Sequence, residues 1–312
     1  MSEEPAEQQA SGGQKPQVVY HYTSMENFLA IVESGSIWTT SIDYLNDVAE
    51  YKFYLRLFRK KLPAIRKKFG LNDSSYFEET LSRNLKEVGF EKRPFVASFS
   101  EIGDSLHHWR SYCPQGNGVS IGLQMECLKR AFVQPKPGVT TPVIASNKVL
   151  YIDKDDMAQM ENDVVNAIAS LDSIRAGVER SKIKGITQGN IFMHTLDTIA
   201  CFRKHRTFES EKEFRILVSG NGTAYDHFLF RPRKTTLRPH IPILIPSSVS
   251  GYEPSNRRSV LERGDGAWDW IESVVVGPSN NMGLTVQSVA AFLKKKRIDA
   301  RVVPSTVTFR DW

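Results

Sequence analysis

The 312-residue sequence predicts an α+β protein in which a curved, mixed β-sheet carries helices inserted between its strands. Short runs of aromatic and β-branched residues recur at strand length, as in FVASFS at residues 95–100 and IESVVVGP at residues 271–278. Longer segments with apolar residues at helical spacing separate these runs, most clearly at residues 154–183. The length fits one large domain, which we place at residues 18–312.

The N-terminal part of the chain is expected to alternate strands with helices. Residues 1–17 contain almost no apolar side chains, which predicts a disordered tail without the apolar centre of a signal peptide. Thr23 or Ser24 caps the first helix and Gly35 ends it. The expected elements are strand 18–23, helix 25–33, strand 37–41, a basic helix limited by Pro63 to about residue 61, and a helix at 75–88.

The rest of the chain is organised around two short strands that a polar loop or short helix joins. The apolar pattern of residues 154–204 predicts a pair of helices inserted into the domain. The expected elements are strands 95–100, 118–123 and 148–152, helices 154–183 and 190–204, strand 211–219, an extended or looped proline-rich segment 231–252, strand 271–278, helix 286–296 and strand 300–303.

Composition excludes several classes of protein. No apolar run approaches the roughly 18 residues of a membrane span, so no membrane partner is expected. The three cysteines, Cys113, Cys127 and Cys201, show no paired spacing. Neither a metal site nor a disulfide framework is therefore expected, and a reducing cytoplasmic location fits best.

Basic residues are clustered in a chain of net charge +6. Residues 56–68 (RLFRKKLPAIRKK) hold seven cations and no anion, and residues 231–238 (RPRKTTLR) hold four cations. Such clusters attract phosphates, including those of nucleic acids. The alternative is a solvated helix face for the first cluster and a surface loop for the second.

Three polar clusters are candidate sites. The first is His21-Tyr22-Thr23, where a strand ends before a helix. A histidine there can present a ring nitrogen to a ligand hydroxyl, and the helix N-terminus can hold an anion. The alternative is a histidine whose hydrogen bonds are satisfied by backbone at a strand edge.

The second cluster combines Ser98 and Ser100 with Trp109 and Arg110. Trp109 would stack on a base or a nicotinamide ring, and Arg110 would pair with a phosphate. In the alternative reading, Trp109 fills the core and Arg110 pairs with a structural carboxylate.

The third cluster is Glu211, Glu213 and Arg215, which alternate along a predicted strand and so share one face. Paired carboxylates beside a cation are suited to orienting or deprotonating a hydroxyl group. The alternative is an exposed strand face with a cross-strand salt bridge. The chain contains no GxGxxG, GxxxxGK[ST] or HExxH sequence, so the common nucleotide and metalloprotease motifs have no support. GVSIG at 118–122 matches GxSxG in letters, but it lies within a predicted strand and not at a strand-to-helix turn, so a serine-hydrolase nucleophile elbow has no support either.

Four motifs in this order resemble a widespread bacterial family known as domain of unknown function 2971. They are HYT at 21–23 with LND at 45–47 and Glu50; SFS at 98–100 with Trp109, Tyr112 and GVSIG at 118–122; EKEFR at 211–215; and VVGP at 275–278. The resemblance extends over residues 20–309. It departs from the family pattern at Phe214, where tryptophan is usual, and in the segment 231–252. It also departs at Val48, a position at which the family often has a proline directly after the Asn-Asp pair.

The layout of histidine, serine and glutamate strands is also similar, more loosely, to ADP-ribosyltransferase-like folds, which hold NAD in the cleft of a split β-sheet. This resemblance implies that His21 contacts the nicotinamide ribose and Thr23 the nearby backbone turn, with Tyr22 also among the cofactor-binding residues. It also implies that Ser98 or Ser100 shapes the nicotinamide pocket. Glu213 would stabilise an oxocarbenium-like transition state and Glu211 would orient the acceptor.

The sequence therefore supports two functions ahead of a third, a partner-binding protein built on the helices at residues 154–204. The first is an NAD-using ADP-ribosyltransferase or NAD-cleaving enzyme that acts on a protein or nucleic-acid acceptor, as a toxin or a phage-defence effector. The second is a non-catalytic module that binds a nucleotide or nucleic acid through Trp109, Arg110 and the basic clusters.

Overall fold

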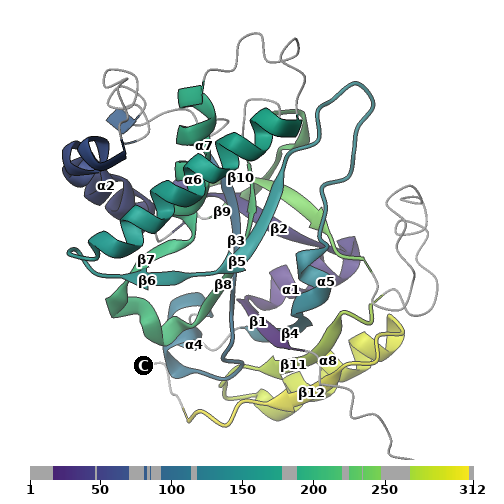
Figure 1. Ribbon diagram of the computed structural model, residues 1–312. Helices are drawn as coiled ribbons and strands as arrows, with labels where there is room; N and C mark the ends of the chain where they lie inside the picture. The colour runs from purple at the N-terminus through teal and green to yellow at the C-terminus, as the bar shows by residue number, and fades with distance from the viewer. Residues whose placement is uncertain are drawn as a thin grey trace, which may run out of the picture.

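The computed structural model describes residues 17–45, 48–69, 81–82, 85, 93–113, 118–177, 188–219, 225–233, 235–246 and 268–308. Within these residues, ten strands form one large mixed sheet, and helices separate many of the strands along the chain (Figure 1). The α+β class predicted from the sequence is confirmed. None of the described helices is long and apolar enough to cross a membrane.

The sheet has one long path with a branch at β3. The path runs β12–β11–β4–β1–β3–β2–β10–β9, while β8 pairs with β3 and with β5. Its strands are β1 (Val18–Thr23), β2 (Ser36–Ser41), β3 (Phe95–Ser100), β4 (Val119–Gln124), β5 (Ile144–Lys148), β8 (Glu213–Val218), β9 (Leu229–Arg233), β10 (Thr236–Leu244), β11 (Ile271–Val276) and β12 (Arg301–Pro304). Two further strands, β6 (Leu150–Ile152) and β7 (Arg203–His205), form a separate parallel pair.

The branch arises because β3 has two partners on one edge. Strand β8 pairs with all six residues of β3, from Phe95 to Ser100, and so occupies one edge. On the other edge, β2 pairs with Phe95 and Val96, and β1 pairs only with Ser100. No described strand pairs with residues 97–99 on that edge, so the sheet is split there between β1 and β2.

Side-chain alternation gives the two faces of β3 different environments. On one face, Phe95, Ala97 and Phe99 enter the main apolar core, which α1 (Met25–Ser34), α5 (Met125–Lys129) and α8 (Met282–Lys295) help to form. On the other face, Val96 joins a second apolar cluster with residues of α2 (Val48–Phe69), α6 (Met157–Gly177) and α7 (Gln188–Cys201). Ser98 and Ser100 alternate with the core residues and so lie on this second face, beyond the apolar cluster.

The end of one predicted helix needs correction. Helix α2 does not end before Pro63 but continues to Phe69. Pro63 is exposed, so water can satisfy the backbone carbonyl that loses its partner. Part of the proline-rich segment 231–252, which was expected to be extended or looped, forms extended strands in the β9–β10 hairpin. The predicted tail, apart from Gln17, and most of the predicted helix at 75–88 lie outside the described residues.

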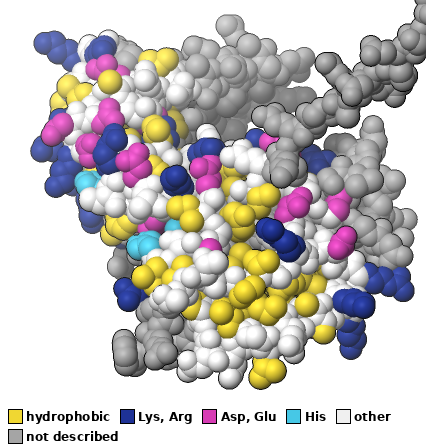
Figure 2. All heavy atoms as spheres, turned by 90° about the horizontal axis from the view of Figure 1, so that it is seen from below, with side chains coloured by type: hydrophobic (Ala, Val, Ile, Leu, Met, Phe, Trp, Pro, Cys, Tyr) yellow, Lys and Arg dark blue, Asp and Glu magenta, His cyan; other side chains and the backbone are white. Residues whose placement is uncertain are grey.

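The surface view in Figure 2 shows how charge is distributed on one face. Acidic and basic side chains are interspersed there, and hydrophobic side chains gather between them. Among the described residues that this view shows, the basic side chains therefore do not form one continuous surface.

Candidate functional site

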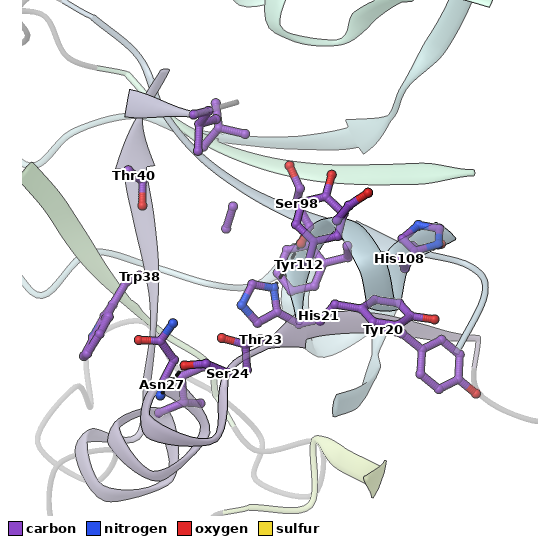
Figure 3. Close-up of a pocket in the computed structure, with 18 of the residues that line it drawn as sticks. Tyr20, His21, Thr23, Ser24, Asn27, Trp38, Thr40, Ser98, His108 and Tyr112 are labelled. Atoms are coloured by element: carbon purple, nitrogen blue, oxygen red, sulfur yellow. Dashed lines mark hydrogen bonds between the residues drawn. The ribbon is translucent and has the colours of Figure 1, made fainter. Parts of the chain in front are cut away.

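A cavity of about 750 Å³ opens beside the split in the sheet. It takes residues from β1, α1, β2, β3, α4 (Leu106–Tyr112), β8, β9 and β10, which are far apart in the sequence. Figure 3 labels lining residues from the first five of these elements. Its polar lining residues are Tyr20, His21, Tyr22, Thr23, Ser24, Glu26, Asn27, Thr40, Ser98, Ser100, His108, Ser111, Tyr112, Glu211, Glu213, Arg231 and Arg238. Sequence-predicted residues of all three clusters therefore line one space.

His21 occupies the split itself. Its Nδ1 lies 3.0 Å from the carbonyl oxygen of Ser98. Because a carbonyl oxygen only accepts hydrogen bonds, Nδ1 carries the proton and the neutral ring keeps Nε2 as an acceptor. Burial lowers the pKa of His21, and the positive charge of Arg231 lowers it further. His21 is therefore a neutral hydrogen-bond acceptor at pH 7.

The carboxylate end of the cavity is a buried charge network. Lys204 Nζ, on β7, lies 2.8 Å from Glu211 Oε2, 3.1 Å from Glu50 Oε2 and 3.4 Å from Glu213 Oε2. Arg215 donates from Nε to Glu213 Oε1 (2.7 Å) and from Nη2 to Glu213 Oε2 (2.9 Å). All five side chains are buried, so three carboxylates and two cations share a space from which water is largely excluded.

The network keeps Glu213 ionised. Burial acts to raise the pKa of Glu213, but the charges of Arg215 and Lys204 and hydrogen bonds from Arg215 and Ser98 outweigh it and hold the pKa at about 2. Because two cations neighbour it, this carboxylate can be buried and charged at once. A fixed negative charge at a cavity wall can stabilise a positive charge that develops on a bound ligand.

His108 lies beside this network, on α4. Burial lowers its pKa to about 4, helped by His107. Its ring stacks on that of Tyr22, with centroids 4.7 Å apart. The Tyr22 hydroxyl donates to the carbonyl of Ile102 (2.8 Å), and burial raises its pKa. His108 is therefore a neutral ring held in place at the cavity wall, and the sequence reasoning did not select it.

Trp109 and Arg110 are not where the stacking hypothesis requires them. Trp109 is 1% exposed and packs with Cys113 and Val275 in a small apolar cluster. Its indole N–H donates to Asp104 Oδ1 (2.7 Å), and it does not line the cavity. The alternative reading of Trp109 as a core residue is thus correct. Arg110 is exposed and does not line the cavity either.

Glu211 requires a smaller correction. The strand begins at Glu213, and Glu211 ends a 3-10 helix, η4 (Arg206–Glu211), before Lys212 at a positive φ of 44°. Strand alternation therefore does not place Glu211 beside Glu213; their shared contact with Lys204 does. The alternative of an exposed strand face is wrong, because Glu213 and Arg215 are 5% and 3% exposed.

Sequence reasoning missed several residues of the site. Glu50 appeared only as part of a motif, and Lys204 carried no signal because one lysine at a predicted helix end looks like surface. Trp38 and Arg231 line the end of the cavity formed by β2 and the β9–β10 hairpin. Among the described residues, no group of three or more His, Cys, Asp or Glu side chains is placed to hold a metal ion.

Comparisons with known proteins bear on part of this site. No curated protein and no solved structure matches the chain. The HYT and SFS motifs and the late VVGP strand lie outside the region that a family model matches. That region, residues 108–216, carries His108, Glu211, Glu213 and Arg215, and it is a domain of the family described as "Protein of unknown function (DUF2971)".

Proposed function

We propose that the cavity binds NAD and that the protein cleaves the bond between nicotinamide and ribose, passing ADP-ribose to an acceptor or to water. The observation that carries the proposal is the convergence of His21, Ser98 and Glu213 on one cavity at a split in the sheet. Ligand pockets of roughly 300–1,000 Å³ are usual, and this cavity of about 750 Å³ has room for much of a dinucleotide. The proposal includes that NAD lies at the split in the sheet, as it does in the cleft of ADP-ribosyltransferase-like folds.

The cleavage step requires from the protein mainly a negative charge near the ribose and groups that hold the ribose in place. Nicotinamide leaves with the electron pair of its bond to ribose C1′, and positive charge develops on the ribose ring. The ionised Glu213 stabilises that charge, and His21 Nε2 accepts a hydrogen bond from a ribose hydroxyl. The oxygen of water or of the acceptor then bonds to C1′, and Glu211 or solvent takes the proton.

The first test is Glu213→Gln, measured as nicotinamide release from NAD. We expect release to fall by a factor of about 100 or more, as when one preorganised electrostatic contact is lost. Glu209→Gln is the matched control, because Glu209 is an exposed glutamate four residues away that does not line the cavity. Glu211→Gln should reduce transfer to an acceptor more than hydrolysis.

Glu213 also neutralises buried cations, so the test must separate loss of chemistry from loss of fold. A Glu213→Gln variant that still binds ADP-ribose with wild-type affinity, but no longer releases nicotinamide, supports the proposal. Equal release by variant and wild type contradicts it. Consumption of NAD is also the chemistry by which such a protein would act as a toxin or phage-defence effector, which expression of wild type and variant in bacteria tests.

A second candidate is a non-catalytic nucleotide-binding module. The observation in its favour is that Arg215 contacts both oxygens of Glu213, as a structural ion pair does. This function predicts that wild-type protein binds ADP-ribose and NAD equally well and leaves NAD intact. Turnover of NAD by the purified wild type excludes it.

A further inference from the structure

We propose that Trp38, Arg231 and Arg238 form a subsite for a phosphate or diphosphate group at the end of the cavity away from Glu213. That these phosphates belong to NAD rests on the proposed function, but the binding of an anion by these residues does not. These residues belong to none of the three polar clusters. Arg231 and Arg238 belong to the basic segment 231–238, for which the sequence alone predicts either a surface loop or a general attraction for phosphates.

The β9–β10 hairpin brings the two arginines together. Arg231 on β9 lies directly opposite Arg238 on β10 in the antiparallel register, so their side chains share one face. His240 pairs with Thr40, and Arg238 is two residues from His240, so this face is also that of Thr40. Both arginines line the cavity, where their like charges favour an anion between them.

Contacts with β2 hold the Arg231 guanidinium in a defined orientation. Its Nη2 donates to Thr40 Oγ1 (3.1 Å), and its central carbon lies 5.0 Å from the centroid of the Trp38 ring. Trp38 in turn packs against His240, with ring centroids 5.0 Å apart. A guanidinium stacked on an aromatic ring loses little freedom on binding, and its planar donors match phosphate oxygens in pairs.

The electrostatic field at this end is positive. The charge of Arg231 lowers the pKa of His21, and burial together with Arg231 lowers the pKa of His240 to about 4. The carboxylates that line the cavity within the described residues are Glu26, which is exposed, and the network members Glu211 and Glu213. The cavity thus has an arginine end and a carboxylate end.

Strand β3 sets the distance between the two ends. Thr40, which contacts Arg231, is paired with Val96, and Glu213 is paired with Ser100. Four residues of strand span about 13 Å, and the long side chains reach inward from both ends. A dinucleotide with its diphosphate on the arginines can therefore place its nicotinamide ribose beside Glu213.

Calorimetric titration of the full chain tests the subsite. The probes are inorganic pyrophosphate, ADP-ribose and adenosine, and the variants are Arg231→Gln, Arg238→Gln and Arg231→Lys. We expect pyrophosphate and ADP-ribose to bind the glutamine variants about tenfold or more weakly, since hydrogen bonds to charged groups are lost. Adenosine binding should not change. Arg231→Lys should also weaken binding, because lysine keeps the charge but not the stacked fork.

Arg59→Gln removes the same charge from an exposed position on α2 outside the cavity, and should leave all affinities unchanged. Melting temperatures show whether each variant is folded. If loss of the Thr40 contact unfolds Arg231→Gln, Arg238→Gln alone provides the test of the subsite. The proposal is overturned if wild type binds neither pyrophosphate nor ADP-ribose, or if both glutamine variants bind them as wild type does. If wild type releases no nicotinamide but the variants lose pyrophosphate affinity, the subsite stands and the catalytic proposal fails.

Discussion

The Nδ1 atom of His21 lies 3.0 Å from the carbonyl oxygen of Ser98, at the place where β1 and β2 diverge along the edge of β3. A side chain therefore supplies a hydrogen bond that a neighbouring strand would supply in an unbroken sheet. The same ring lines the cavity (Figure 3). One residue thus both completes the sheet and contributes to the candidate site.

The role of His21 in the sheet predicts a loss of stability in His21→Ala. The substitution leaves the Ser98 carbonyl without this donor, and losing such a partner in a buried place costs about 1–3 kcal/mol. Urea unfolding measures the change. His205→Ala is a useful comparison, because the hydrogen bonds of the His205 side chain to Thr207 are exposed. Equal stability of His21→Ala and wild type would show that water satisfies the carbonyl.

Histidines with lowered pKa values predict a loss of stability in mild acid. The pKa values of His108 and His240 fall from 6.5 to about 4 on folding, because burial disfavours their charged forms. Between pH 6.5 and 4 the unfolded chain binds more protons than the folded one, so the stability present above pH 6.5 decreases as the pH falls toward 4. His240→Gln should flatten the dependence of unfolding free energy on pH in this window. An unchanged slope would contradict the burial of a neutral His240.

Lys204 is predicted to be the most sensitive lysine among those described here. Lys204→Met removes a buried cation that contacts three carboxylates, and breaking a buried ion pair costs about 3–5 kcal/mol. Lys148→Met is the control: Lys148 is exposed and pairs with Glu101 at the surface, so its loss should cost under about 1 kcal/mol. Chemical denaturation of both variants makes the comparison. Similar losses would mean that Lys204 is more hydrated than its burial indicates.

Trp109 is predicted to matter for stability and not for nucleotide affinity. Trp109→Phe leaves a void in a packed cluster and removes the hydrogen bond to Asp104, so the melting temperature should fall. Because Trp109 does not line the cavity, the affinity for ADP-ribose below that temperature should stay within about twofold. A large loss of affinity without a change in melting temperature would restore Trp109 as a ligand-stacking residue.

The basic run on α2 predicts salt-dependent binding to nucleic acid. Arg59, Lys60, Lys67 and Lys68 are exposed and Lys61 is half-buried, and Lys68 also pairs with Glu161. Replacing all five with glutamine should weaken binding to DNA or RNA, most at low salt, and leave pyrophosphate affinity unchanged. Fluorescence anisotropy at several salt concentrations measures this. Wild type that shows no salt-dependent binding would identify the run as a solvated helix face.

Local patterns along the chain were sufficient to predict most of the elements. Strand β3 was predicted at its observed bounds, because an uninterrupted run of aromatic, β-branched and small residues has few other structures open to it. The pairing places β1, β3 and β8, which carry His21, Ser98 and Glu213, next to one another in the sheet. The predicted helix end before Pro63 is wrong, because an exposed proline in a long, packed helix destabilises that helix less than its local effect on the backbone indicates.

The sequence by itself determined the α+β class, the strands that carry His21, Ser98 and Glu213, and the presence of clustered cations. Only the tertiary structure decided that Trp109 is buried, that Lys204 and Glu50 complete the carboxylate network, and that Arg231 and Arg238 face the cavity. The physical reason is that alternation and helical spacing depend on neighbours along the chain. Burial of a charge and the lining of a cavity depend on contacts between residues distant in sequence, which the packing of the whole sheet and its helices establishes.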